Sequence, residues 1–393
     1  MKQLVDVVNF NSDASCLSTR RWFDIISGGS DSELCNWLQL YPKYGKKVVL
    51  GLTGATIADM AVFNPEAIDI IRSYPDFFQL IIRPFMHDNS IVRTSAGFKI
   101  NLKFGLLSLE KEFGKTTIPY YLPPEFMLTN QQLAILADMG ICGTFINAER
   151  FSHEISSRIP TTPYFVKGVF GAQLGCVPFG SKHTKNYLES IHLFDSTAWN
   201  REVLSSDSDY IYSWRDGESP FLVPDPIARE DNWLRTEDIS INRVHIDYEN
   251  IVLSNNDELE DSLYHSYPLH SMLPWMRDFK TFAFINRSML LEDRLTDDLK
   301  SPFALTWLLS ISSDVFSAIE KPSPSISLKS NIDDGMASKF TILRSEKGFE
   351  GDEFFILAEE CRRTGVLPEN MLNADKWLHH RRYLARLNYL ESI

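Results

Sequence analysis

The chain has 393 residues, of which 44% are hydrophobic and 23% are charged. This composition is typical of a folded globular protein and excludes an intrinsically disordered chain, and the length suits one barrel-sized domain with an added region. The formal net charge of -13 argues against a nucleic-acid partner, because surfaces that bind phosphate backbones concentrate lysine and arginine.

The sequence predicts a cytoplasmic protein without a membrane partner. It contains no run of about eighteen apolar residues, and its first residues lack the pattern of a secretory signal. The five cysteines are odd in number and widely spaced, which favours reduced thiols over disulfides or zinc-ligand pairs. We expect no cofactor and no metal. The oligomeric state stays open, with a homodimer as one option.

Short hydrophobic runs that are typical of β-strands punctuate the first part of the chain. They lie at residues 4–10, 47–52, 77–82, 117–122, 140–146, 175–177, 242–247 and 281–285. Apolar residues at helical spacing separate several of them, as at 65–72 and 102–113. Thr129 and Gln132 form a capping box for another helix, which ends near Gly140. The alternation indicates a mainly parallel α/β sheet, and the unbroken hydrophobic runs favour a barrel covered on both faces.

Composition changes along the chain predict its organisation. The span 150–240 is rich in Ser, Asp, Pro and Trp, which predicts long loops or a small insertion over the barrel mouth. The last hundred residues have helical rather than β-type patterns. These patterns lie at residues 304–320, 351–363 and 374–390. We therefore expect a barrel over residues 1–290 and a helical C-terminal region over residues 291–393.

A proline-rich motif provides the first candidate for chemistry. The sequence Tyr-Tyr-Leu-Pro-Pro-Glu ends in Glu125, directly after a predicted strand and before the capped helix. Barrel enzymes carry catalytic groups in such loops, at the carboxyl ends of strands. Glu125 is therefore a candidate catalytic acid, and a solvated surface glutamate is the alternative that this motif alone leaves open.

A second acidic motif ends the predicted strand at 242–247. Asp247 and Glu249 occupy alternating positions, so they would point the same way on a continued strand. Repulsion between neighbouring carboxylates raises the pKa of one and leaves the other ionised, which suits general acid catalysis. An acid pair bridged by Arg243 or a lysine is the structural alternative.

Two further polar segments belong to the same analysis. His87 and Asp88 follow a third predicted strand, and polar groups that converge from several strands are how a pocket for a polar ligand is built. Residues 214–218, Trp-Arg-Asp-Gly-Glu, are another acidic candidate. We rank them behind Asp247, because no clear strand leads into them.

These motifs resemble glycoside hydrolase family 57, the family of α-amylases, 4-α-glucanotransferases and branching enzymes. Three blocks carry the resemblance, at residues 84–88, 105–140 and 245–249. It implies a distorted (β/α)7 barrel over about residues 1–290, followed by a helical region. It also implies a carbohydrate substrate and a retaining mechanism, in which Glu125 is the nucleophile and Asp247 the general acid/base.

The first motif of the family normally contains two histidines, where this chain has Asn9 and Asn11. An amide can exchange hydrogen bonds with sugar hydroxyls but does not titrate near neutral pH, which leaves room for a different sugar position or substrate. The predicted substrate-binding residues are Asn9, Asn11, Asp13, His87, Asp88, Tyr121, Trp214, Tyr248 and Glu249.

Three alternatives stay open at this stage. Water or a sugar hydroxyl as acceptor would make the protein a hydrolase or a transglycosylase. A metal-dependent carbohydrate deacetylase could use Asp13 and His87 as ligands, but a second histidine at ligand spacing is missing. The replaced histidines also leave open a catalytically inactive, carbohydrate-binding relative.

Overall fold

The structure is a computed structural model. It describes residues 1–13, 19–88, 90–114, 120–147, 163–167, 173–179, 196–247, 259–260, 289, 292–293, 295, 301–311 and 374–393. The strand expected at 281–285 and the helix expected at 351–363 lie outside these residues. So do Tyr248 and Glu249, two of the predicted substrate-binding residues.

A parallel sheet forms one half of the fold, in the order β3-β2-β1-β8, with β9 also paired to β1. Its strands are β1 (Lys2–Phe10), β2 (Val48–Leu52), β3 (Phe78–Ile81), β8 (Tyr210–Asp216) and β9 (Ile241–Arg243). β8 accompanies β1 from Gln3, which is opposite Tyr210, to Asn9, which is opposite Asp216. β9 reaches only the amino end of β1, where Arg243 is opposite Leu4.

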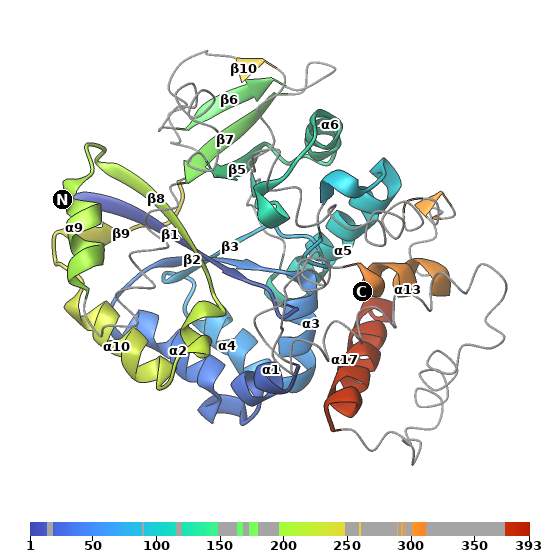
Figure 1. The fold of residues 1–393 in the computed structure, drawn as a ribbon, viewed down its shortest axis with the longest axis horizontal. Coiled ribbons are helices and arrows are strands. Elements are labelled where there is room, and N and C mark those ends of the chain that lie inside the picture. Colours follow the sequence, from blue (N-terminus) through green and yellow to red (C-terminus); the bar gives the residue numbers. More distant parts are fainter. Residues whose placement is uncertain are drawn as a thin grey trace, which may run out of the picture.

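A second sheet has the order β10-β6-β7-β5-β4. Its strands are β4 (Tyr120–Tyr121), β5 (Gly143–Asn147), β6 (Tyr164–Lys167), β7 (Gln173–Phe179) and β10 (Leu259–Glu260). A parallel bridge between Ile82 and Tyr121 connects β3 to β4, and β7 contacts β8. Among the described strands, β1, β2, β3, β4, β5, β7 and β8 thus follow one another around a ring. In Figure 1, β5 and β7 lie above the parallel sheet.

The predicted α/β barrel is confirmed, and one of its strands corrects the sequence analysis. Six of these ring strands coincide with predicted hydrophobic runs, but the remaining one is β8, inside the span 150–240 that we expected to hold loops or an insertion. The run at 242–247 forms only the three-residue β9. The sequence analysis missed β8 because Ser213 and Arg215, on its outer face, are buried polar residues that interrupt the hydrophobic pattern.

Helices cover the outside of the barrel. They are α1 (Thr19–Ile26), α2 (Glu33–Lys43), α3 (Gly54–Phe63), α4 (Pro65–Ser73), α5 (Ser95–Phe113), α6 (Asn130–Asp138), α9 (Thr197–Ser205), α10 (Pro226–Thr236), α13 (Pro302–Ser310) and α17 (Ala374–Glu391). Short 3-10 helices are η1 (Gly29–Asp31), η2 (Ser90–Val92), η3 (Pro124–Phe126) and η6 (Ser219–Leu222). The C-terminal α17 packs against α1, α3 and α13 (Figure 1).

Several helix predictions are confirmed. Thr129 forms the expected capping box with Gln132 at the start of α6, and α4, α5 and α17 lie where helical spacing predicted them. The helix expected at 304–320 is α13 over its first part, and the described residues end there at 311. Within the described part of the chain, no helix has the length and apolar character needed to cross a bilayer.

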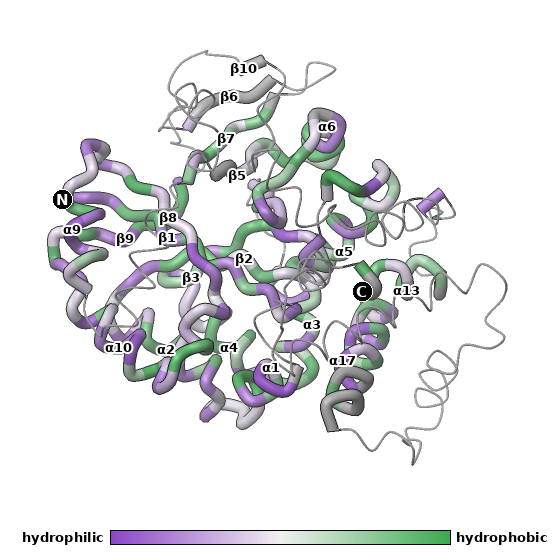
Figure 2. Tube along the Cα trace, viewed as in Figure 1, coloured by the Kyte–Doolittle hydropathy of each residue, from purple (hydrophilic) through white to green (hydrophobic). Residues whose placement is uncertain are grey.

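The strands divide the core into two layers. On β1, the side chains of Leu4, Val8 and Phe10 pack into the larger cluster that the helices share, whereas Val5 and Val7 pack into a cluster inside the barrel. In Figure 2, β2 is mostly hydrophobic, whereas the covering helices are mixed along their length. Because successive side chains of a strand point to opposite faces, this alternation also fixes which residues reach the barrel interior at the strand ends.

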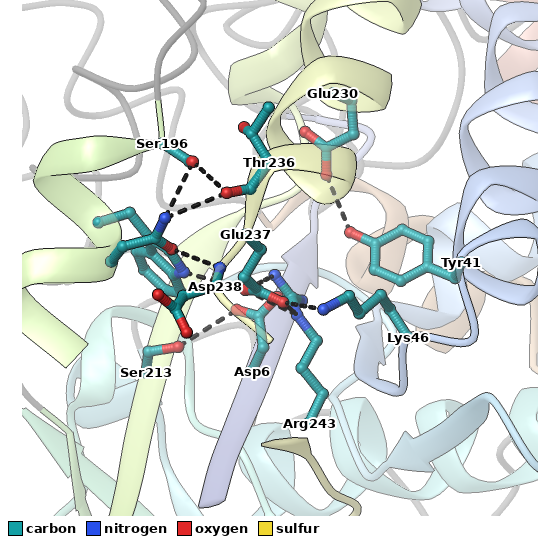
Figure 3. A network of polar contacts seen from close by, with 12 residues as sticks. Asp6, Tyr41, Lys46, Ser196, Ser213, Glu230, Thr236, Glu237, Asp238 and Arg243 are labelled. Carbon is teal, nitrogen blue, oxygen red and sulfur yellow. Dashed lines mark hydrogen bonds and ion pairs between the residues drawn. The ribbon is translucent and has the colours of Figure 1, made fainter. Parts of the chain in front are cut away.

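Buried charges connect β1, β8 and β9, and Figure 3 shows Asp6 of β1 beside Ser213 of β8 and Arg243 of β9. The carboxylate of Asp6 accepts hydrogen bonds from Arg215 on β8 and, at 2.6 Å, from Arg243 on β9. Arg243 also pairs with Glu237 at 2.8 Å, and Glu237 pairs with Lys46 at 2.8 Å. A buried charge is tolerated only when it is paired and hydrogen-bonded, so this network fixes the three strands relative to one another.

The network predicts an acid-sensitive contribution to stability. Burial raises the pKa of Asp6, but the charges of Arg215 and Arg243 outweigh burial and hold that pKa below its usual value. A carboxyl group with a lowered folded-state pKa stabilises the fold fully above its unfolded pKa of about 4, and this contribution is lost as the pH falls further.

We therefore expect Asp6→Asn to lower the free energy of unfolding at pH 7 by about 3–5 kcal/mol, because it leaves two buried arginines without their shared partner. The variant should also lose less stability than the wild type below about pH 4. Urea denaturation followed by circular dichroism at a series of pH values measures both effects. Asp209→Asn, whose side chain is 91% exposed, is the control and should behave like the wild type. Identical acid profiles for Asp6→Asn and the wild type would contradict this account.

Candidate active site

Glu125 lies at the carboxyl edge of the barrel, in the 3-10 helix that follows β4. Its backbone has a φ of 55°, in the left-handed region that residues with a side chain rarely adopt. The peptide N–H groups of Phe126 and Met127 hold this turn by donating to the carbonyls of Pro123 and Pro124, each at 3.1 Å. Such strain costs about 1–3 kcal/mol and is concentrated at functional sites in proteins.

Two residues from the loop after β3 contact Glu125 or its strand. The Nε2 atom of His87 lies 3.2 Å from Oε1 of Glu125. The Nη2 atom of Arg83 lies 3.0 Å from Nδ1 of His87, and its Nη1 atom donates to the carbonyl of Leu122 at 2.8 Å. The sequence analysis placed His87 at the same rim as Glu125, and the structure brings these two side chains together.

The carboxyl end of β8 contributes two more acids. Asp216 is opposite Asn9 of β1 and shares the inner face of β8 with Trp214, which belongs to the cluster inside the barrel. Two residues later, the buried carboxylate of Glu218 accepts a hydrogen bond from the peptide N–H of Asn11. Between these acids, a Cβ atom on Gly217 would lie 2.5 Å from the ring of Phe10, so the turn requires glycine.

The charges of these acids act on one buried cation, Arg83. Burial lowers the pKa of Arg83 to about 10, while the charges of Glu218, Glu125 and Asp216 act in the opposite direction. The three carboxyl groups therefore lie within electrostatic reach of a single guanidinium that is 2% exposed. We call Glu125, Asp216, Glu218, His87 and Arg83 the acid cluster.

The strand that was expected to lead to Asp247 ends four residues earlier, which corrects the predicted strand at 242–247. β9 ends at Arg243, and the peptide of Ile246 exchanges hydrogen bonds of 2.8 and 2.9 Å with the side chain of Gln79, the second residue of β3. Asp247 is exposed and follows this contact beside the amino half of β3, whereas Glu125 follows the carboxyl end of β4. The structure brings Asp216, at the carboxyl end of β8, to the edge that carries Glu125.

The predicted sugar contacts near the first strand differ in their surroundings. The side chain of Asn9 is buried, and its Oδ1 atom has no hydrogen-bond partner. Asn11 is engaged in its own loop, since its Oδ1 accepts from the peptide N–H of Asp13 at 3.0 Å. Of these two, Asn9 is the one that offers a polar atom to a ligand.

The predicted aromatic contacts are core residues. Tyr121 is 0% exposed and belongs to the cluster between strands and helices, with its ring centroid 6.0 Å from that of Phe98. The ring of Trp214 packs edge-on against that of Phe126 inside the barrel, with 4.9 Å between the ring centroids. Tyr121 therefore packs on the outer face of its strand, and Trp214 packs inside the barrel against the residue that follows Glu125.

Asp88 and Asp13 are held in other ion pairs. Asp88 is buried against Arg93, which also pairs with Glu292 at 3.1 Å. Asp13 pairs with Arg386 at 2.9 Å. The predicted deacetylase ligands Asp13 and His87 thus have different partners, and within the described ranges no group of three or more His, Cys, Asp or Glu side chains could hold a metal ion.

Comparisons with known proteins place the fold. No protein-family model matches the chain, and no curated protein matches its sequence. Among solved structures, it is similar to a 4-alpha-glucanotransferase from Thermococcus litoralis, at 12% identity with a TM-score of 0.60, over 86% of this chain and 59% of that chain. The GH57-type branching enzyme from Pyrococcus horikoshii matches at 12% identity with a TM-score of 0.62, over 98% of this chain and 95% of that chain.

The GH57 branching enzyme from Thermococcus kodakaraensis matches at 11% identity with a TM-score of 0.61, over 98% of this chain and 96% of that chain. The chain has the fold of the family 57 glycoside hydrolases. The resemblance seen in the sequence is therefore confirmed at the level of the fold. The polar ends of β1, β3, β4 and β8 meet at one edge because these strands pair in parallel.

The C-terminal helix of this family 57 fold supports the loop beside the acid cluster. Arg386 on α17 donates to Asp13 and Ser12 and, at 2.8 Å, to Asp59 of α3. Its guanidinium is buried. Arg386, close to the C-terminal end of the sequence, therefore holds the loop in which Asn11 contacts Glu218.

We expect Arg386→Met to lower the free energy of unfolding by about 3–5 kcal/mol, because the buried Asp59 and the partly buried Asp13 lose a charge partner. A fall in Tm measured by calorimetry checks this. Arg381→Met, at an exposed position of the same helix, is the matched control and should leave Tm almost unchanged. Equal Tm values for the two variants would show that the buried ion pairs do not hold α17.

Proposed function

We propose that the protein is a retaining glycoside hydrolase or transglycosylase that acts on an α-linked glycan, with Glu125 as nucleophile and Asp216 as general acid/base. One observation carries the proposal: Glu125, which follows β4, and Asp216, which ends β8, lie at the same carboxyl edge of the barrel. Barrel enzymes build their active sites at this edge, and glycoside hydrolysis requires two carboxyl groups that face one sugar.

The surroundings of Glu125 favour the role of nucleophile. A nucleophilic carboxylate must be ionised before substrate binds. A nearby cation and a hydrogen bond to the charged form both favour ionisation, and Glu125 has Arg83 within electrostatic reach and His87 at 3.2 Å. The strained backbone of Glu125 presents this side chain from a rigid turn.

Asp216 takes the place that the sequence analysis gave to Asp247. It is partly exposed on the inner face of β8, so that a proton donor at this position can reach the leaving oxygen and then water. Glu218, two residues on, is anchored by Asn11 and stabilises the turn that carries Asp216. The pattern of two acids separated by one residue, first noted at 247–249, thus also occurs at the end of a ring strand.

The reaction we propose is a double displacement. An oxygen of Glu125 attacks the anomeric carbon, the bond to the leaving oxygen breaks, and Asp216 gives its proton to that oxygen. Asp216 then takes a proton from water or an acceptor hydroxyl, whose oxygen attacks the anomeric carbon and releases Glu125. The anomeric configuration is retained, and the mechanism requires the two carboxyl groups to be about 5–5.5 Å apart.

The substrate class follows from the similar structures and from Asn9. Those structures are named as a 4-alpha-glucanotransferase and branching enzymes, which supports an α-linked glycan as substrate. The amide oxygen of Asn9, buried beside Asp216 and without a partner, can accept a hydrogen bond from a sugar hydroxyl. Water as acceptor makes the protein a hydrolase, and a sugar hydroxyl makes it a transglycosylase.

Glu125→Gln and Asp216→Asn should each lower kcat/KM on α-linked glucose oligosaccharides by a factor on the order of 10²–10⁴, as expected when a group that moves a proton or forms the covalent bond is lost. Asp247→Asn is the matched control and should retain activity within a factor of about three. Oligosaccharide analysis measures turnover, and NMR of the first product gives its anomeric configuration.

Loss of activity in Asp247→Asn with full activity in Asp216→Asn would overturn the assignment of the acid/base. Inversion at the anomeric carbon would overturn the nucleophile. A wild-type protein that binds these oligosaccharides without cleaving or transferring them would instead be a carbohydrate-binding relative.

A further inference from the structure

Arg83, His87 and Glu125 form a continuous row of hydrogen-bonding groups at the carboxyl edge. The distances are 3.0 Å from Nη2 of Arg83 to Nδ1 of His87 and 3.2 Å from Nε2 of His87 to Oε1 of Glu125. Arg83 is 2% exposed and His87 is 6% exposed, so bulk water competes little for these bonds. Each ring nitrogen of His87 therefore has a defined protein partner.

The chemistry of Arg83 fixes the direction of both bonds. A guanidinium can only donate hydrogen bonds, so the Nδ1 atom of His87 must accept. The single ring proton of a neutral imidazole then resides on Nε2, which donates to the carboxylate of Glu125. We infer that His87 is a positioning residue, which Arg83 locks in the Nε2–H tautomer so that it orients the Glu125 carboxylate. This inference rests on the proposed function only for the role of Glu125.

The loop that carries Arg83 and His87 is rigid enough for this task. The side chain of Asn101, on α5, brackets Met86: its Oδ1 accepts from the peptide N–H at 2.8 Å, and its Nδ2 donates to the carbonyl at 3.1 Å. A Cβ atom on Gly105 would lie 2.1 Å from the carbonyl oxygen of Arg83, so α5 packs directly on the loop. The bond from Arg83 to the carbonyl of Leu122 joins this loop to the strand that leads to Glu125.

The hydrogen bond from His87 affects how Glu125 meets the substrate. The hydrogen bond to Oε1 restricts rotation of the carboxylate, so its orientation toward the anomeric carbon is set before the sugar arrives. The donor is neutral, which leaves the proton transfers of the reaction to Asp216. His87 thus acts through Glu125 rather than on the substrate.

Two substitutions test the roles of the two ring nitrogens of His87 separately. In His87→Gln, the amide nitrogen reaches the position of Nε2 and can still donate to Glu125. In His87→Asn, the shorter amide reaches only the position of Nδ1, so it faces Arg83 but not Glu125. We expect kcat to fall by a factor of about three or less in the first variant and by a factor of about 10–100 in the second, with KM little changed in both. Equal losses in the two variants would overturn the positioning role.

A spectroscopic measurement tests the tautomer without any activity. In 15N-labelled wild-type protein, the resonances of His87, identified by their absence from His87→Gln, should show a protonated Nε2 and an unprotonated Nδ1 at neutral pH. A proton on Nδ1 in the folded protein would overturn the inference. A wild-type protein that shows the expected tautomer but turns over no glycan would contradict the proposed function and leave the hydrogen-bond assignment standing.

Discussion

The candidate site depends on one buried charge, the guanidinium of Arg83, near the inner surface of the barrel. Burying a charge is costly unless opposite charges and hydrogen-bond acceptors surround it. Arg83 meets this requirement through the carbonyl of Leu122, the ring of His87 and the carboxylates around it. The same cation that needs the acids nearby therefore brings acids from β4 and β8 to one place, although these residues are far apart in the sequence.

Buried charges are also paired with opposite charges on the outer face of the barrel strands. β8 alternates between Trp214, which packs inside, and Arg215, which pairs outside with Asp6 and Glu230. This pairing along β1 gives β8 its register, and the register places Asp216 opposite Asn9. Ion pairs on the outer face of the strands thus determine which acid reaches the site on the inner face.

Much of the fold could be predicted from local patterns in the sequence, because hydrophobic runs and the capping box at Thr129 are local signals. The position of Glu125 was predictable for the same reason, since a proline-rich turn joins its strand to a capped helix. β8 was not predictable, because Arg215 has partners at positions 6 and 230 that only the folded chain brings together. The same limit applies to Asp13, whose partner Arg386 is 373 residues away. The acid pairs at residues 216–218 and 247–249 have the same pattern, so the choice between them depended on the register of the sheet.

The anomeric configuration of products formed with azide tests the assignment of Glu125 and Asp216 most directly. With an aryl α-glycoside whose leaving group needs no proton, azide should attack the glycosyl-enzyme of Asp216→Ala and give the retained α-glycosyl azide. In Glu125→Ala, azide should replace the missing nucleophile and give the inverted β-glycosyl azide. Formation of the retained azide by Asp247→Ala but not by Asp216→Ala would contradict the account.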